Sequence, residues 1–253
     1  MHVGMATGFA NHVPIDDRRF MQEEFDLIRL GDRLGLDSVW MTEHHFADYS
    51  ISPNPLQYLA HVSGFAPRMW LGTQVIVMPW WDPVRVAEQI SALDHMSGGK
   101  CIIGFGRGLA RIEFEGFRID QGTARERFDE GVDLVMRALE SGILEYDGTI
   151  FKQPRRELRP RPLRGLRGRA FAAVGTEGSA RAAARLGLGR LYLNQPMVHS
   201  SQGQDAAKKH AAAVGKPGDP WYDTWVATHA DVPPPMPFMS NMTFVDEIGR
   251  AHV

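Results

Sequence analysis

The sequence has few of the features that mark secreted, membrane or nucleic-acid-binding proteins. Its 253 residues include one cysteine, Cys101, which excludes an internal disulfide framework and fits a reducing compartment. No uninterrupted apolar run is long enough to span a bilayer, and the first residues lack the basic region and long apolar core of a signal peptide. The formal net charge of −2 argues against a broad nucleic-acid-binding surface. We therefore expect a cytoplasmic protein with no membrane or nucleic-acid partner.

The rest of the composition is ordinary for a globular protein, with 43% hydrophobic and 23% charged residues. The length suits one large α/β barrel or two small domains. Strands are expected at residues 3–9, 38–41, 71–78, 100–105, 170–176, 190–195 and 238–246, and helices at 20–34, 54–61, 83–96, 128–139, 179–186 and 204–214. This alternation indicates a (β/α)8 barrel rather than an open sheet. We count seven strands where a closed barrel has eight. Either the pattern misses one strand, or the eighth strand and its helix are absent from this chain.

Two stretches are expected to be loops. Residues 155–169 carry seven arginines and two prolines, a composition that suits either a polyanion site or a solvated loop, and the overall charge favours the loop. Residues 217–237 are rich in proline and tryptophan and are also expected to form a long loop.

The strand expected at residues 38–41 is followed by a carboxylate and two imidazoles, Glu43, His44 and His45. The carboxyl ends of strands are where α/β folds place their chemistry. A histidine there can transfer protons near neutral pH, and a neighbouring glutamate can orient it or contact a ligand. The structural alternative is a histidine that caps a loop, which the neighbouring residues disfavour.

Glycines surround an arginine after the fourth expected strand, in the run Gly104-Phe105-Gly106-Arg107-Gly108-Leu109. Glycine lets a backbone approach a ligand closely, and Arg107 can bind a phosphate through two hydrogen bonds. The run is not a Rossmann fingerprint, because Leu109 stands where the third glycine is required. Tight packing explains these glycines equally well.

Hydroxyl groups lie at the start of the alanine-rich helix, in the run Gly175-Thr176-Glu177-Gly178-Ser179. Hydroxyls and free N–H groups at a helix N-terminus suit a phosphate, and ordinary capping by Thr176 or Ser179 is the alternative. Together with Arg107, this run suggests a phosphorylated cofactor. No convincing metal-ligand spacing is present, because His44 and His45 are adjacent and no Cys/His cluster supports them.

Several uncommon strings give the sequence a family resemblance that runs from the N-terminus to about Leu188. In order they are Glu43-His44-His45-Phe46, Asn54-Pro55, Gly72-Thr73, Pro83-Val84-Arg85 with Glu88, Leu93-Asp94, Met96-Ser97 and Arg107-Gly108-Leu109. The sequence therefore resembles the bacterial luciferase-like flavin monooxygenases. The resemblance implies a TIM-type barrel over residues 1–253 that uses reduced FMN or, in a sister branch of the family, the deazaflavin F420.

The resemblance also implies residue roles around the flavin ring. His44 matches the catalytic histidine, which manages protons around the flavin C4a-(hydro)peroxide. Glu43 matches an acidic residue beneath the flavin. Gln74 and Val75 fall where the family has a cis non-proline peptide that supports the isoalloxazine ring.

The expected phosphate site follows from the same resemblance. Arg107 matches the phosphate-binding arginine, Leu109 offers its backbone, and Thr176 and Ser179 match hydroxyl positions around the phosphate. Val174, on the preceding strand, is included among the cofactor-binding residues.

Other matches and departures concern assembly and chain length. His45 and Glu88 match positions that meet across the family's dimer interface, which implies a homodimer. Gly106 replaces a cysteine of the luciferases, so light emission is not implied, and Gly175 replaces an acidic residue. The family's mobile lid has no recognisable counterpart, and we expect the natural protein to continue beyond Val253.

The leading hypothesis is a two-component monooxygenase, in which a flavin reductase supplies reduced FMN and one atom of O2 passes to a small organic substrate. The alternatives are an F420-dependent oxidoreductase of the same fold and a non-catalytic flavin-binding relative. A barrel with no ligand would leave the three unusual strand ends unexplained.

Overall fold

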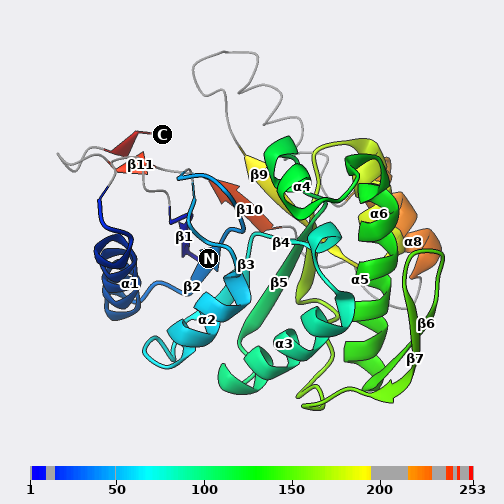
Figure 1. Ribbon diagram of the computed structural model, residues 1–253, viewed down its shortest axis with the longest axis horizontal. Coiled ribbons are helices and arrows are strands. Elements are labelled where there is room, and N and C mark those ends of the chain that lie inside the picture. Colours follow the sequence, from blue (N-terminus) through cyan, green and yellow to red (C-terminus); the bar gives the residue numbers. More distant parts are fainter. Residues whose placement is uncertain are drawn as a thin grey trace. The chain divides into compact units, whose positions relative to one another are not determined.

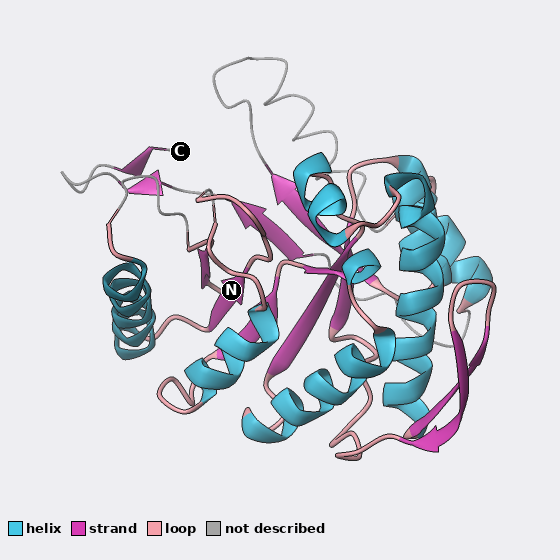
Figure 2. Ribbon diagram, in the orientation of Figure 1, coloured by secondary structure: helices cyan, strands magenta, loops and turns pink. Residues whose placement is uncertain are grey.

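The structure of the protein is a computed structural model that describes residues 2–9, 15–48, 50–194 and 216–229. It also describes three short backbone segments, at residues 238–241, 244–245 and 251–252. The chain forms two compact units, residues 1–170 and 171–253. Strands and helices alternate along the chain in both units, as Figure 1 and Figure 2 show.

The first unit contains a sheet of parallel strands that pair in the order β1, β2, β3 and β5, and the short β4 also pairs with β5. The strand bounds are Gly4–Thr7 (β1), Ser38–Met41 (β2), Trp70–Thr73 (β3), Ile76–Val77 (β4) and Cys101–Gly106 (β5). The main helices are α1 (Asp17–Leu34), α2 (Pro55–Ser63), α3 (Pro83–Met96) and α5 (Ala124–Ser141). Helix α3 packs between α2 and α5, so the three lie in order beside the strands (Figure 1).

The helices begin at residues that satisfy their free N–H groups. The Asp16 carboxylate accepts a hydrogen bond from the Arg19 amide at 3.0 Å, and Gly35 ends α1 with a φ of +83°. The Asp82 carboxylate accepts from the Val84 amide at 2.8 Å, with Pro83 at the first helical position. Both helices lie where the sequence predicts them.

Glycines on neighbouring strands make room for the side chains of β2. All four residues of β2 are buried, which is typical of a parallel strand covered on both faces. Trp40 pairs with Gly72, where an added Cβ would lie 2.3 Å from the indole ring. Ser38 pairs with Gly4, where an added Cβ would lie 2.1 Å from the serine Oγ. The core of this unit therefore depends on these two glycines.

The continuous strand expected at residues 71–78 is wrong, because the chain breaks into β3 and β4 around a cis peptide bond between Gln74 and Val75. The hydroxyl of Thr73, the last residue of β3, forms hydrogen bonds with the backbone of β5 beside this break. It donates to the Gly104 carbonyl at 3.0 Å and accepts from the Gly104 amide at 2.9 Å. The Thr73 side chain thus links the end of β3 to β5.

Two features of the first unit are missing from the sequence prediction. One is the seven-residue helix α4 (Arg111–Phe117), which follows the glycine-rich turn after β5. The other is the antiparallel hairpin of β6 (Ile143–Asp147) and β7 (Lys152–Glu157), so the arginine-rich stretch begins on a strand rather than in a loop. Short 3-10 turns at Met78–Trp80 (η1) and Gln121–Thr123 (η2) complete the unit.

The second unit repeats the parallel strand–helix pattern. Strand β8 (Ala170–Ala173) pairs with β9 (Gly189–Asn194), and β9 pairs with β10 (Phe238–Asn241). The helices are α6 (Glu177–Arg185) and α8 (Pro220–Thr228), which pack together. Helix α8 lies inside the loop expected at residues 217–237, so that prediction is wrong there.

The end of the chain also differs from the prediction. The strand expected at residues 238–246 corresponds to β10 (Phe238–Asn241) and β11 (Phe244–Val245), with residues 242–243 and 246 outside the described residues. Strand β11 pairs antiparallel with β12 (Ala251–His252). The helix expected at residues 204–214 lies outside the described residues.

The parallel strands and their connecting helices confirm the α/β class and the arrangement of a partial (β/α)8 barrel. The seven expected strands correspond to β1, β2, β3 with β4, β5, β8, β9 and β10. None of the helices that the structure describes combines the length and the apolar character needed to cross a membrane.

Candidate functional site

Glu43 lies just beyond the carboxyl end of β2 and is 2% exposed. Its carboxylate accepts three hydrogen bonds, from the Val77 amide at 2.8 Å, the Trp81 indole at 2.7 Å and His45 Nε2 at 3.1 Å. Burial raises the pKa of the Glu43 carboxyl, and these three donors oppose that rise. Glu43 therefore ties the end of β2 to the segment that follows β4.

His44 is bound by a carboxylate that the sequence analysis did not single out. Its Nδ1 lies 3.0 Å from Oε1 of Glu113, which also accepts the His45 amide at 2.9 Å. Glu113 is on α4 and is 3% exposed, whereas the His44 side chain is 34% exposed. An ionised carboxylate can only accept hydrogen bonds, so Glu113 restricts the roles that the His44 ring can take in this contact.

His45 packs into an aromatic cluster within its own chain. Its ring contacts Trp80 and Phe117 edge-on, with centroid separations of 5.3 and 4.6 Å. Trp80 and Phe117 are themselves stacked at 5.4 Å. This cluster holds the segment after β2 against η1 and α4.

Gln74 and Val75 are joined by a cis peptide bond, and Gln74 is buried. The Gln74 amide donates to the Met41 carbonyl at 2.7 Å, so this bond lies beside the end of β2. The Val75 side chain lies against Gly106, the last residue of β5.

Arg107 follows directly after β5 and is exposed. Within the part of the chain that the structure describes, its guanidinium makes no hydrogen bond or ion pair. Gly108 has a φ of +79°, a left-handed conformation that favours glycine, and Leu109 is 84% exposed. The turn therefore presents the cation of Arg107 and the side chain of Leu109 to solvent.

Three of the expected cofactor-binding residues belong to the second unit. Val174 is buried and its amide donates to the Leu191 carbonyl at 3.1 Å. Thr176 and Ser179 form a capping box at the start of α6, in which the Ser179 amide donates to Thr176 Oγ1 at 3.2 Å. Thr176 and Ser179 thus cap α6, which is the structural alternative to a role in phosphate binding.

The structure brings Glu43, His44, Gln74 and Val75 together at the carboxyl ends of β2, β3 and β5. It also adds Glu113, which the sequence analysis missed. Within the described ranges, no group of three or more histidine, cysteine, aspartate or glutamate side chains could hold a metal ion.

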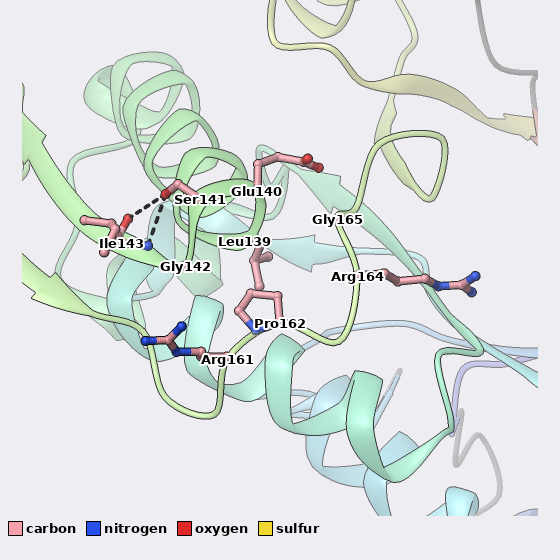
Figure 3. A pocket seen from close by; sticks show the side chains of 9 residues that line it. All are labelled: Leu139, Glu140, Ser141, Gly142, Ile143, Arg161, Pro162, Arg164 and Gly165. Carbon is pink, nitrogen blue, oxygen red and sulfur yellow. Dashed lines mark hydrogen bonds between the residues drawn. The ribbon is translucent and has the colours of Figure 1, made fainter.

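A cavity of about 300 Å³ lies in the first unit, at the end of α5 (Figure 3). It is lined by Leu139, Glu140, Ser141, Gly142, Ile143, Arg161, Pro162, Arg164 and Gly165. The opposite end of α5 contacts η1, where Arg127 Nε donates to the Pro79 carbonyl at 2.9 Å. Since the 18 residues of α5 span about 27 Å, this cavity is remote from the strand-end residues.

The family model described as luciferase-like monooxygenase matches residues 1–232. The oxygenase component of the flavin-dependent trigonelline monooxygenase of Acinetobacter baylyi is 29% identical over 148 residues, which cover 58% of this chain and 41% of that protein. The alkanal monooxygenase alpha chain of the Kryptophanaron alfredi symbiont is 28% identical over 146 residues, with the same coverage. The chain thus spans less than half the length of the curated relatives it matches.

Three solved structures extend the comparison. Monooxygenase RslO1 from Streptomyces bottropensis is 27% identical, with a TM-score of 0.72 over 90% of this chain and 67% of that one. The oxygenating constituent of 3,6-diketocamphane monooxygenase from Pseudomonas putida, solved with FMN, has a TM-score of 0.74 at 13% identity over 90% and 64% of the two chains. The F420-dependent tetrahydromethanopterin reductase of Methanopyrus kandleri has a TM-score of 0.59 at 18% identity over 83% and 62%. The last two similarities concern the fold alone.

Proposed function

Because the chain belongs to the luciferase-like monooxygenase family, we propose that it is the oxygenase of a two-component system, which uses reduced FMN and O2 to oxygenate a small organic substrate. The observation that carries this proposal is the segment from Arg107 to Glu113. At one end it presents a guanidinium that is unpaired within the described chain, and at the other it holds the carboxylate that binds His44. One short segment thus supplies both an anion-binding group and the support of a proton-transfer group.

The residues present fit the phosphate of a flavin mononucleotide. Arg107 has no carboxylate partner among the described residues, so its charge is available to an anion. A guanidinium binds phosphate through two parallel hydrogen bonds. Gly108 fixes the turn that carries Arg107, because its φ of +79° favours glycine and a Cβ there would lie 2.8 Å from the Val77 side chain. The backbone of Leu109 is the neighbouring donor we propose. Val174, Thr176 and Ser179, which belong to the second unit, stay predictions from the family resemblance.

The ring of the cofactor is proposed to lie by Glu43, Gln74 and Val75. When bound, the reduced flavin supplies the electrons that activate O2. His44 accepts or returns a proton at Nε2, because Nδ1 is engaged with Glu113. Glu43 acts through its three hydrogen bonds, which fix the backbone beside the ring position.

A second candidate is a hydride transfer that depends on F420. Enzymes of this kind share the fold, as the tetrahydromethanopterin reductase and an F420-dependent secondary alcohol dehydrogenase at a TM-score of 0.63 illustrate. Titration with reduced FMN and with reduced F420 distinguishes the two, because our proposal requires tighter binding of FMN.

Two protein partners are part of the proposal. One relative is named as an oxygenase component, which supports a separate flavin reductase. We also propose a homodimer, as the match of His45 and Glu88 to interface positions implies. Sedimentation of the purified chain tests the dimer, and a monomer at all concentrations would contradict it.

Oxygen uptake with photoreduced FMN, followed by mass analysis of a substrate panel, tests the function. We expect one substrate to gain a single oxygen atom with O2 consumed in proportion. His44→Ala should still bind reduced FMN but release peroxide instead of oxygenated product. Coupled turnover unchanged in His44→Ala would eliminate the proposed role of this residue, and absence of binding to reduced FMN would refute the oxygenase proposal.

A further inference from the structure

Glu113 is a buried carboxylate that makes two hydrogen bonds through one oxygen atom. Oε1 accepts from Nδ1 of His44 at 3.0 Å and from the amide of His45 at 2.9 Å. The residue is only 3% exposed, and a buried carboxylate is costly unless donors surround it. Its position 69 residues away in the sequence shows that the fold, not local geometry, brings this partner to His44.

The neighbours of Glu113 on α4 fix its direction. Phe114 packs edge-on against Trp80 with ring centroids 5.5 Å apart, and Phe117 stacks on the same indole at 5.4 Å. A Cβ at Gly116 would lie 2.2 Å from the ring of Phe46. Helix α4 is therefore closely packed against the segment that carries His44.

The turn that carries His44 is held in an unusual backbone conformation. Phe46 has a φ of +61°, which is uncommon for a residue other than glycine and which the surrounding contacts must maintain. One of those contacts is the hydrogen bond from the His45 amide to Glu113. The same carboxylate thus restrains both the backbone of this turn and the imidazole ring.

We propose that Glu113 is the positioning residue for His44 and holds its neutral imidazole as the Nδ1–H tautomer. An ionised carboxylate accepts and cannot donate, so it selects the ring form that has a proton on Nδ1. Nε2 then has the lone pair and is the atom that exchanges protons. The consequence for catalysis rests on the proposed oxygenase function, but the tautomer itself does not.

A purely structural role for Glu113 predicts a different outcome. If the carboxylate served only the His45 amide, its replacement would alter stability without changing the proton position on His44. The tautomer of His44 therefore separates positioning from support, and it is observable without cofactor, substrate or turnover.

The test is the ¹⁵N NMR spectrum of the histidine rings in the full chain at about pH 9, roughly two units above the ordinary histidine pKa. Loss of one ring system in His44→Gln assigns the signals among the ten histidines. We expect His44 of the unaltered protein to show Nδ1 as the protonated nitrogen. A protonated Nε2 in that spectrum overturns the proposal, whatever the variants do.

Two variants on α4 complete the experiment. Glu113→Gln can donate as well as accept, so the ratio of the Nδ1–H to the Nε2–H form should fall by about tenfold or more. Glu115→Gln is the matched control, because Glu115 is exposed and pairs with Arg111 at 2.6 Å. The tautomer ratio of His44 should be unchanged in this variant. An unchanged ratio in folded Glu113→Gln contradicts the proposal, and if that variant does not fold, the spectrum of the unaltered protein decides.

Turnover gives an independent readout. Coupled oxygenation should fall by about 10- to 100-fold in Glu113→Gln, less than the roughly 10²- to 10⁴-fold contribution of a positioned acid–base group, because His44 itself is retained. The Kd for reduced FMN should be unchanged. If the tautomer shifts as expected but no protein oxygenates a substrate, the proposed function fails while the positioning role stands.

Discussion

The Val75 side chain occupies the space that a Cβ atom at position 106 would need. An ideal Cβ built on Gly106 would lie 2.2 Å from Cγ2 of Val75, a distance that real Cβ atoms essentially never show. Gly106 is the last residue of β5, and Val75 lies in the break between β3 and β4. The absence of a side chain at position 106 thus lets two strand ends approach each other at the candidate site.

Gly106→Ala should destabilise the protein, because the new methyl group must displace Val75 from a packed position. Overpacking of this kind costs about 1–3 kcal/mol in the free energy of unfolding. Urea denaturation measures the loss. The double variant with Val75→Ala should recover part of it, since the two residues are in contact. If the loss in the double variant equals the sum of the losses in Gly106→Ala and Val75→Ala, Val75 does not cause the effect.

Asp94→Asn should cost about 3–5 kcal/mol in the free energy of unfolding, because it leaves Arg169 buried without its counter-charge. The two side chains pair at 2.6 Å and are 3% and 10% exposed. Glu177→Gln is the matched control on an exposed pair, since Glu177 lies 2.6 Å from Arg181, and it should cost at most about 1 kcal/mol. Similar losses in the two variants would contradict this view of the buried pair.

The same pair predicts a dependence on pH. Burial would raise the pKa of Asp94, but hydrogen bonds from Arg169 and Cys101 outweigh it and hold the pKa below the ordinary value of 3.8. A carboxyl whose pKa is lowered on folding stabilises the protein at pH values above its pKa in the unfolded chain. This stability is lost as the pH falls through its pKa in the folded protein. The difference in unfolding free energy between the unaltered protein and Asp94→Asn should therefore shrink below about pH 3.8. A difference that grows on acidification would refute the assignment.

Cys101 should not react with thiol reagents in the folded protein. It is fully buried, and burial together with the Asp94 carboxylate raises its pKa to about 12. The thiolate is the reactive form, so labelling with a disulfide reagent at about pH 8 should be negligible until urea unfolds the chain. One thiol per chain should then react. Rapid labelling without urea would show that the thiol is accessible and ionised.

Sequence reasoning found the elements whose local signals are strong. Helix α3 begins with Asp82 and Pro83, whose capping and fixed φ specify a start without tertiary help. The same signal was present at Asp219 and Pro220, and Trp221 and Trp225 repeat at helical spacing, so α8 was predictable in principle. The prolines around α8 favoured a loop in the sequence analysis, so this helix was not predicted.

The candidate site was only partly accessible from the sequence. Glu43 and His44 stand out because they follow a buried strand directly. Glu113 does not, because it lies on a seven-residue helix without a side-chain cap and 69 residues from its partner. The break at Gln74 depends on contacts with Met41 and Gly104 that only the folded sheet provides. Long-range partners of this kind need the structure.

Anaerobic titration with reduced FMN tests most directly whether these strand ends hold a reduced flavin beside an imidazole. The unaltered protein should bind, and Arg107→Gln should raise the Kd by about tenfold or more, since a hydrogen bond to a charged group is worth about 1.5–3 kcal/mol. Arg111→Gln, which removes an exposed cation already paired with Glu115, should leave the Kd unchanged, as should His44→Ala. Binding that is equal in the unaltered protein and in Arg107→Gln, or absent from both, would contradict the proposed site.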